Sequence, residues 1–247
     1  MKQKKRIGII IQARMGSTRL PTKVMMDLCG KPMLWHIIQR VKNSKKADEV
    51  IIATTTQPMD KTILDLCDET HIKSFAGSKD DVLDRYIKAA RTYDIDTIVR
   101  ITADCPLIDP TIIDDLIDKH AAEGNDYTSN IVERTFPRGL DAEVVELQTL
   151  EHICRKTSEQ RYHEHVTLYI YTHPDEFKIG SMTAQGMYHN PQWRLTVDTK
   201  EDFELIKAIY ERLYKGDNII DNKDAFELLR QTPELTHMNE HVEQKRV

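Results

Sequence analysis

The chain has 247 residues, and its 35 Lys and Arg residues against 40 Asp and Glu residues give a formal net charge of −5. Hydrophobic residues make up 40% and charged residues 30%, which is typical of a globular protein and excludes collagen, a disordered chain and a disulfide scaffold. The mild acidity gives no indication of a nucleic-acid binder, which normally carries a basic face. The sequence contains no run of about 18 apolar residues, so no membrane span is predicted.

The amino-terminal segment has basic residues before an apolar run, as a signal peptide does. The run IGIII is shorter than the roughly 7–15 residues of a signal core, and polar Gln12 and Arg14 follow at once. We therefore predict a strand over 6–12 and a cytoplasmic protein. The four cysteines form no CxxC pair, which predicts free thiols rather than a disulfide framework or a thiolate zinc site.

Strand-like and helix-like runs alternate through the first half of the chain. Asp109 is a predicted helix N-cap, and Pro32 and Pro110 are predicted first residues of helices. The alternation predicts an α/β fold with a mainly parallel sheet and helices on both faces, whose ligands bind beyond the carboxyl ends of the strands. The predicted strands are 6–12, 49–55, 72–75 and 96–102, and the predicted helices are 32–43, 60–70, 80–93 and 109–122.

The pattern changes near residue 125, where extended segments surround a loop. No linker or repeat interrupts the chain there, so we predict one domain over 1–247. The predicted elements are two helical stretches within 147–173, strands at 176–182 and 192–199, and helices at 200–215 and 224–231.

The segment 13–23 follows the first predicted strand and is rich in cations and hydroxyl groups. Backbone N–H groups can form an anion-binding nest there, and guanidinium groups can hold a polyphosphate. Neither GxxxxGK[ST] nor GxGxxG is present, and a solvated surface turn is the alternative interpretation. The predicted anion ligands are the N–H groups of Gly16, Ser17 and Thr18 and the side chains of Arg14, Arg19 and Lys23.

Two aspartates are candidate ligands for a divalent cation. Asp104 directly follows the predicted strand 96–102, and Asp198 lies between a predicted strand and a predicted helix. Magnesium takes one or two carboxylates together with phosphate oxygens and water. Alternatively, Asp104 caps a turn and Asp198 is the N-cap of the helix.

Several segments, in order and spanning about residues 6–205, resemble the nucleotide-sugar cytidylyltransferases. The resemblance is to the acylneuraminate and 3-deoxy-manno-octulosonate cytidylyltransferases, and most of all to the spore-coat-polysaccharide branch. It implies a three-layer α/β/α nucleotidyltransferase fold, like that of nucleotide-diphospho-sugar transferases. It also implies a small α/β elaboration at 125–175 that caps the acceptor pocket and pairs two subunits. The segments are IIQARMGSTRLPTKVMMDLCGKPMLWH, DDVLDRYIKAA, RITADCPLIDP, FPRGLDAEVV, YHEHVTLYI and RLTVDTKEDF.

The resemblance also implies roles for individual residues. Arg14, Lys23, Asp104 and Asp198 would be catalytic, and the two aspartates would bind Mg²⁺. Many relatives have Arg where this chain has Ala76, in the segment that would contact cytosine and ribose. The implied CTP-binding residues are Ala13, Arg14, Gly16, Ser17, Thr18, Arg19, Lys23, Ala76, Gly77, Ser78, Asp80, Val82, Thr102 and Asp104.

The acceptor would bind between the two aspartates. Arg138 is suited to hold an anionic acceptor. Asp141 and Glu143 would share a face of a strand, and Glu164 and His165 complete the predicted set. A metal site at His163 and His165 is disfavoured because residues two apart on a helix point to different faces, and a structural role for His165 is the alternative.

These observations predict Mg²⁺-dependent transfer of CMP from CTP to an oxygen of an acidic sugar, with release of pyrophosphate, for surface polysaccharide or glycoconjugate synthesis. The predicted partners are CTP, the acidic acceptor and a second copy of the chain, with no nucleic acid and no membrane. One alternative acceptor is a phosphonate or sugar phosphate. A glycosyltransferase usually has Asp-x-Asp, where this chain has Ala103–Asp104–Cys105. A non-catalytic nucleotide-binding protein is the remaining alternative.

Overall fold

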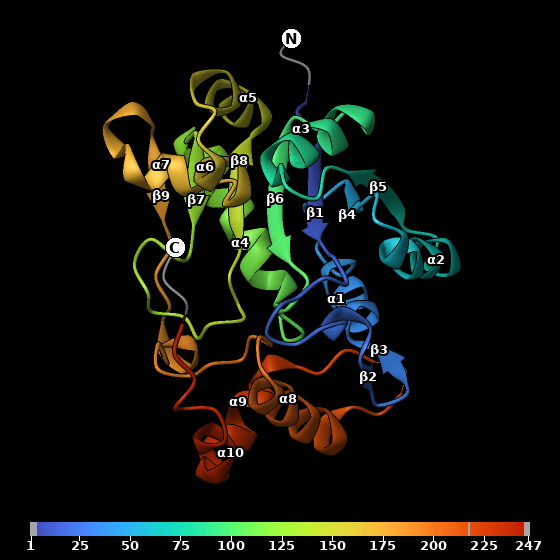
Figure 1. The fold of residues 1–247 in the computed structure, drawn as a ribbon. Helices are drawn as coiled ribbons and strands as arrows, with labels where there is room; N and C mark the ends of the chain where they lie inside the picture. Colours follow the sequence, from blue (N-terminus) through green and yellow to red (C-terminus); the bar gives the residue numbers. More distant parts are fainter. Residues whose placement is uncertain (1–3, 217, 245–247) are drawn as a thin grey trace.

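The centre of the molecule is a seven-stranded sheet (Figure 1). The computed structural model describes residues 4–216 and 218–244. The strand order β5-β4-β1-β6-β8-β7-β9 places β1 (Ile7–Gln12) between β4 (Glu49–Thr55) and β6 (Thr97–Thr102). β1, β4, β6 and β5 (Lys73–Gly77) are parallel, so their carboxyl ends share one edge of the sheet. The predicted α/β fold with a mainly parallel sheet is confirmed.

The second half of the chain extends the same sheet. β8 (Glu143–Glu146) is antiparallel to both β6 and β7 (Tyr127–Ser129), and β7 is parallel to β9 (Ile179–Ser181). The strands of the region that begins near residue 125 therefore continue the central sheet.

Helices cover both faces of the sheet. Alternate residues of each strand point to opposite faces, so one strand contributes side chains to two separate cores. Ile9 and Ile11 of β1 belong to the core under α1, α2, α4, α8 and α9, whereas Ile10 belongs to the core under α3, α5, α6 and α7. The first group is α1 (Met33–Val41), α2 (Lys61–Thr70), α4 (Pro110–Glu123), α8 (Lys200–Leu213) and α9 (Asn222–Gln231). The second is α3 (Val82–Thr92), α5 (Leu147–Lys156), α6 (Gln160–Glu164) and α7 (Leu168–Thr172).

The start of α1 differs from the prediction. Pro32 lies in a short strand, β3 (Lys31–Pro32), which pairs with β2 (Asp27–Leu28), so Pro32 is extended and the helix begins at Met33. The turn between the two strands uses Cys29 and Gly30 at φ 55° and 83°, the backbone that a two-residue hairpin turn requires. The N-cap prediction for α4 is confirmed, because the Asp109 carboxylate accepts from the Thr111 N–H.

The predicted strand over 192–199 is wrong. Its residues divide their backbone hydrogen bonds between two loops: Leu195 N–H donates to Arg138 O at 2.7 Å and Val197 N–H donates to Asp104 O at 2.8 Å. Only an isolated bridge between Arg138 and Arg194 forms in the described residues of this segment. The contact with Asp104 brings Asp198 to the carboxyl edge of the sheet.

Two further details refine the predictions. The stretch 147–173 forms three helices rather than two, and α10 (Pro233–His237) follows the predicted last helix. The four cysteines are free, as predicted. Among the described residues, no helix combines the length and apolar character needed to cross a membrane.

Candidate active site

The loop after β1 is held in place by its backbone. Met15 N–H donates to the buried carboxylate of Asp60 at 2.7 Å, and Ala13 N–H donates to Ala53 O at 3.1 Å. Asp60 was not predicted from the sequence. Ser17 N–H donates to Met15 O at 2.9 Å, so this amide is used within the loop rather than in the predicted anion nest.

The two candidate metal ligands meet at one lysine. Lys23 Nζ lies 3.0 Å from a carboxylate oxygen of Asp104 and 3.0 Å from one of Asp198. It also donates to Val197 O at 2.6 Å. The structure thus brings together residues that are 175 positions apart in the chain. The two carboxylates converge on a single cationic group.

The electrostatics of this cluster favour its charged forms. Burial by itself lowers the Lys23 pKa, but the carboxylates of Asp104 and Asp198 together raise it above the ordinary lysine value. Burial raises the Asp104 pKa, yet Lys23 and the Thr102 hydroxyl outweigh burial and hold this pKa below its usual value. The Thr102 Oγ1 donates to Asp104 Oδ1 at 2.5 Å.

Asp198 is fixed from its other side. Arg194 Nη2 donates to Asp198 Oδ2 at 2.8 Å, while Arg19 Nη2 lies 2.9 Å from Asp198 Oδ1. Thr199, rather than Asp198, is the N-cap of α8 and forms a capping box with Asp202. The N-cap alternative for Asp198 is therefore wrong, and its carboxylate is available to face the basic loop.

A cavity of about 410 Å³ lies over this cluster at the carboxyl edge of the sheet. Arg14, Ser17, Thr18 and Arg19 of the basic loop line one part of it. The full lining is Gln12, Ala13, Arg14, Ser17, Thr18, Arg19, Lys23, Val24, Thr102, Ala103, Asp104, His165, Asp198 and Gln244.

A smaller side pocket of about 160 Å³ shares Gln12, Ala13, Arg14 and His165 with this cavity. Its other lining residues are Val82, Arg85, Arg100 and Glu164. Neither arginine was predicted from the sequence.

Each of the two arginines of the side pocket forms hydrogen bonds and, within the described residues, also has a buried N–H group without an acceptor. Arg85 donates to Ser78 O at 2.7 Å, and Arg100 donates to Glu143 at 2.8 Å and to Gln12 at 3.1 Å. In the described part of the chain, the buried Nε atoms of Arg85 and Arg100 have no hydrogen-bond partner.

The residues predicted for cytosine and ribose lie partly elsewhere. Val82 lines the side pocket, whereas four others lie along the end of β5 and the following turn, outside the linings of the cavity and the side pocket. Ser78 Oγ accepts from the Asp80 N–H at 3.2 Å, and Gly77 O accepts from the Thr56 N–H at 3.1 Å. The four are Ala76, Gly77, Ser78 and Asp80.

The predicted acceptor residues also separate. Glu164 and His165 reach the side pocket. Glu143 is not part of the pocket lining. Its carboxylate accepts from Arg100, which lines the pocket, and from the Thr167 hydroxyl at 2.7 Å.

Arg138 and Asp141 lie outside the linings of the cavity and the side pocket. Asp141 pairs with Arg134 and lies before the start of β8. The expectation that Asp141 and Glu143 share a face of one strand is therefore wrong. Arg138 N–H donates to Trp193 O at 3.1 Å and joins the bridge to Arg194.

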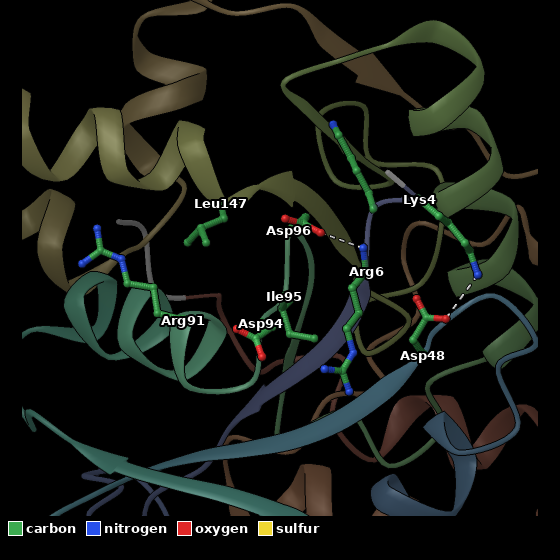
Figure 2. Close-up of a pocket in the computed structure, with 9 residues that line it drawn as sticks. Lys4, Arg6, Asp48, Arg91, Asp94, Ile95, Asp96 and Leu147 are labelled. Carbon is green, nitrogen blue, oxygen red and sulfur yellow. Dashed lines mark hydrogen bonds and ion pairs between the residues drawn. The ribbon is translucent and has the colours of Figure 1, made fainter. Parts of the chain in front are cut away.

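A larger hollow of about 860 Å³ lies near the amino-terminal ends of the strands (Figure 2). Its cations are paired with carboxylates: Lys4 with Asp48, Arg6 with Glu49, and Arg91 with Glu151. These ion pairs largely neutralise the cations that line this hollow.

The comparison of the sequence with known families decides the identity. The sequence model of the family described as cytidylyltransferase matches residues 8–229, which include the basic loop and both aspartates. The chain belongs to the cytidylyltransferase family. It is therefore a nucleotidyltransferase enzyme.

Individual cytidylyltransferase relatives agree with this assignment. The chain is 40% identical to the spore coat polysaccharide biosynthesis protein SpsF of Bacillus subtilis over 211 residues, which is 83% of this chain and 87% of that protein. The solved structure of a cytidylyltransferase from Leptospira borgpetersenii superimposes with a TM-score of 0.89 at 31% identity, over 99% of this chain and 100% of that one. CMP:2-keto-3-deoxy-manno-octonic acid synthetase complexed with CTP shares the fold, with a TM-score of 0.63 at 16% identity over 84% and 99% of the two chains.

Proposed function

We propose that this cytidylyltransferase transfers CMP from CTP to an oxygen of an acidic sugar, such as an ulosonic or acylneuraminic acid, and releases pyrophosphate. The observation that carries the proposal is the cluster of Lys23, Asp104 and Asp198 facing the basic loop. In this reaction the acceptor oxygen forms a bond to the α-phosphorus while the bond to pyrophosphate breaks. The work of the protein is to position the groups and to stabilise charge.

The chain's own cations account for the binding of a triphosphate. Arg14, Arg19 and Lys23 line one cavity, so they would offset the charge of the phosphates and of the departing pyrophosphate. The fixed loop backbone, anchored by Asp60, would hold these side chains in place before the nucleotide arrives.

The donor set fits magnesium. Asp104 and Asp198 both lie within 3.0 Å of the Lys23 ammonium group, so two hard oxygen ligands of the kind that Mg²⁺ prefers converge on one point, which Lys23 fills in this structure. The described residues include no group of three or more His, Cys, Asp or Glu placed to hold a metal ion, so phosphate and water would supply the remaining ligands. Bound Mg²⁺ would offset phosphate charge and lower the pKa of the attacking oxygen.

The side pocket supports an anionic acceptor. The guanidinium groups of Arg85 and Arg100 line this pocket, and their positive charge would attract the carboxylate of an acidic acceptor. Arg100 already pairs with Glu143 at 2.8 Å, so the carboxylate of an acidic acceptor would add a counter-ion chiefly for Arg85, which a neutral sugar would not. The predicted homodimer and cytoplasmic location stay predictions.

The acceptor class is tested by pyrophosphate release with CTP and Mg²⁺ against ulosonic acids, sugar 1-phosphates and phosphonates. Release only with ulosonic acids supports the proposal, and release only with one of the other classes overturns the acidic-sugar assignment. In Arg85→Met we expect the KM for the acid to rise about tenfold or more, the equivalent of one charge-assisted hydrogen bond. Arg91→Met, outside the site, is the matched control.

A further inference from the structure

The carboxyl-terminal segment, defined as residues 233–244, returns to the candidate active site. Figure 1 shows its red trace running from α10 back toward the middle of the molecule. Asn239 is only 1% exposed, although chain ends are usually poorly packed. Gln244 lines the cavity that holds the basic loop and the two aspartates.

The side chains of Asn239 and Gln244 both form hydrogen bonds with Arg194. Asn239 Nδ2 donates to Arg194 O at 2.9 Å and to Asp202 Oδ1 at 2.7 Å. Gln244 Oε1 accepts from Arg194 Nη1 at 2.7 Å. The segment therefore binds the backbone of Arg194, its guanidinium group and its carboxylate partner.

Arg194 uses every nitrogen of its guanidinium group. Nε donates to Asp202 Oδ1 at 2.8 Å, Nη2 donates to Asp198 Oδ2 at 2.8 Å, and Nη1 donates to Gln244. Because the guanidinium is planar and rigid, fixing two of its nitrogens sets the direction of the third. Asp202, with no exposed surface, also accepts from the Asp198 N–H at 2.9 Å.

This network determines which oxygen of Asp198 faces the cavity. Arg194 holds Oδ2, and Oδ1 is left to face Lys23 and Arg19. The match to the cytidylyltransferase family model ends at residue 229, so the segment that secures this orientation lies beyond the matched region.

We propose that Asn239 and Gln244 are positioning residues, which act through Arg194 to hold the Asp198 carboxylate in the orientation that binds a divalent cation. The inference rests on the proposed function, because it assigns Asp198 to the cation. Neither residue touches the reacting atoms in this account. Their loss should weaken cation binding while leaving the binding of the nucleotide to the basic loop intact.

The test measures CTP binding by calorimetry in EDTA and Mn²⁺ binding by electron paramagnetic resonance in the presence of CTP. In Asn239→Ala we expect CTP affinity in EDTA within about twofold of wild type. The half-saturating Mn²⁺ concentration should rise about tenfold, as for other residues that orient a metal ligand. Gln244→Ala removes an exposed side chain, so we expect this variant to fold as the wild type does and to give a rise of about threefold.

Asn222→Ala is the matched control. Asn222 is 2% exposed and its Nδ2 likewise donates to a backbone carbonyl, of Leu107, and to a carboxylate, of Asp109. Asn222 Oδ1 also accepts from Arg40 Nη2 at 2.7 Å, so this variant should lose at least as much stability as Asn239→Ala, without a change in the Mn²⁺ concentration dependence. An equal shift in Asn222→Ala, or no shift in both Asn239→Ala and Gln244→Ala, overturns the inference.

Asp198→Ala separates the two proposals. If it leaves Mn²⁺ binding unchanged, the metal assignment of the proposed function is wrong and the inference falls with it. If Asp198→Ala weakens Mn²⁺ binding but Asn239→Ala and Gln244→Ala do not, only the inference is wrong.

Discussion

Lys23 is the common counter-ion of the two carboxylates in the site, those of Asp104 and Asp198. Both of its ion pairs are 3.0 Å long, and its side chain is 11% exposed. The sequence placed Lys23 and Asp104 at the carboxyl edge, since each follows a recognisable strand. It could not show that the two aspartates share one lysine, because that contact depends on the path of residues 193–198 between two loops.

Lys23→Met should destabilise the folded protein in EDTA by about 3 kcal/mol, since it leaves two partly buried carboxylates without a common counter-ion. Urea unfolding measures the change. Added Mg²⁺ should restore part of the loss. Lys61→Met, at an exposed pair with Asp65, should cost less than about 0.5 kcal/mol. A Lys23→Met protein as stable as wild type in EDTA would contradict this account.

Asp104→Asn keeps the shape of the side chain but removes its charge. Turnover should fall at least about 100-fold, as when another major electrostatic group is removed from an active site. Asp118→Asn, on the exposed face of α4, should retain wild-type turnover. A folded Asp104→Asn enzyme with full magnesium-dependent activity would remove Asp104 from the site.

At the scale of elements, the site depends on loops that approach each other closely. Strand and helix periodicity predicted the sheet and most helices, but it also predicted a strand at 192–199. That segment has the alternating pattern of a strand, yet within the described residues it forms only the isolated bridge between Arg138 and Arg194. The contacts of Arg85, Arg100 and Arg194 also escaped prediction, because a long side chain that crosses between elements leaves no local pattern.

Gly139 allows one of these close approaches. Its φ is 100°, and a Cβ there would lie 2.4 Å from the Leu195 carbonyl carbon. We expect Gly139→Ala to lower the free energy of unfolding by at least about 3 kcal/mol, through strain and overpacking combined. Gly124, also at positive φ but with open space around it, should cost only about 1 kcal/mol when changed to Ala. Equal losses in the two variants, by urea unfolding, would contradict the packing argument.

His163 links α6 to the N-cap of α3. Its ring nitrogens lie 2.8 Å from Asp81 Oδ2 and 2.9 Å from Thr157 O. Both partners are acceptors, so the doubly protonated ring satisfies both. Burial lowers the His163 pKa, but these two acceptors outweigh burial and raise it above the ordinary value.

Because the folded-state pKa is raised, the stabilisation is fully present below about pH 6.5 and is lost as the pH rises through the folded pKa. His163→Gln should therefore lower stability by about 1 kcal/mol more at pH 5.5 than at pH 8.5. Chemical denaturation at the two pH values measures this difference. A loss that is larger at pH 8.5 would contradict the charged pair.

Across the whole molecule, the parallel sheet brings distant segments to one edge. The loop after β1, the end of β6 and the segment before α8 meet there, as the rule for ligand sites in such sheets predicts. Topology could therefore be predicted from the sequence, together with the basic loop and both aspartates. The carboxyl-terminal segment could not, because its polar composition gives no sign that Asn239 is buried against Arg194.

The most direct test of the central claim is the mass of the product formed with Mg²⁺, an active acidic acceptor and each of CTP, UTP, GTP, ATP and dTTP. We predict an acceptor adduct carrying CMP from CTP alone, with one pyrophosphate released for each adduct. An adduct with a different nucleotide, or CTP consumption without an adduct, would contradict the claim that this site transfers CMP to an acidic sugar.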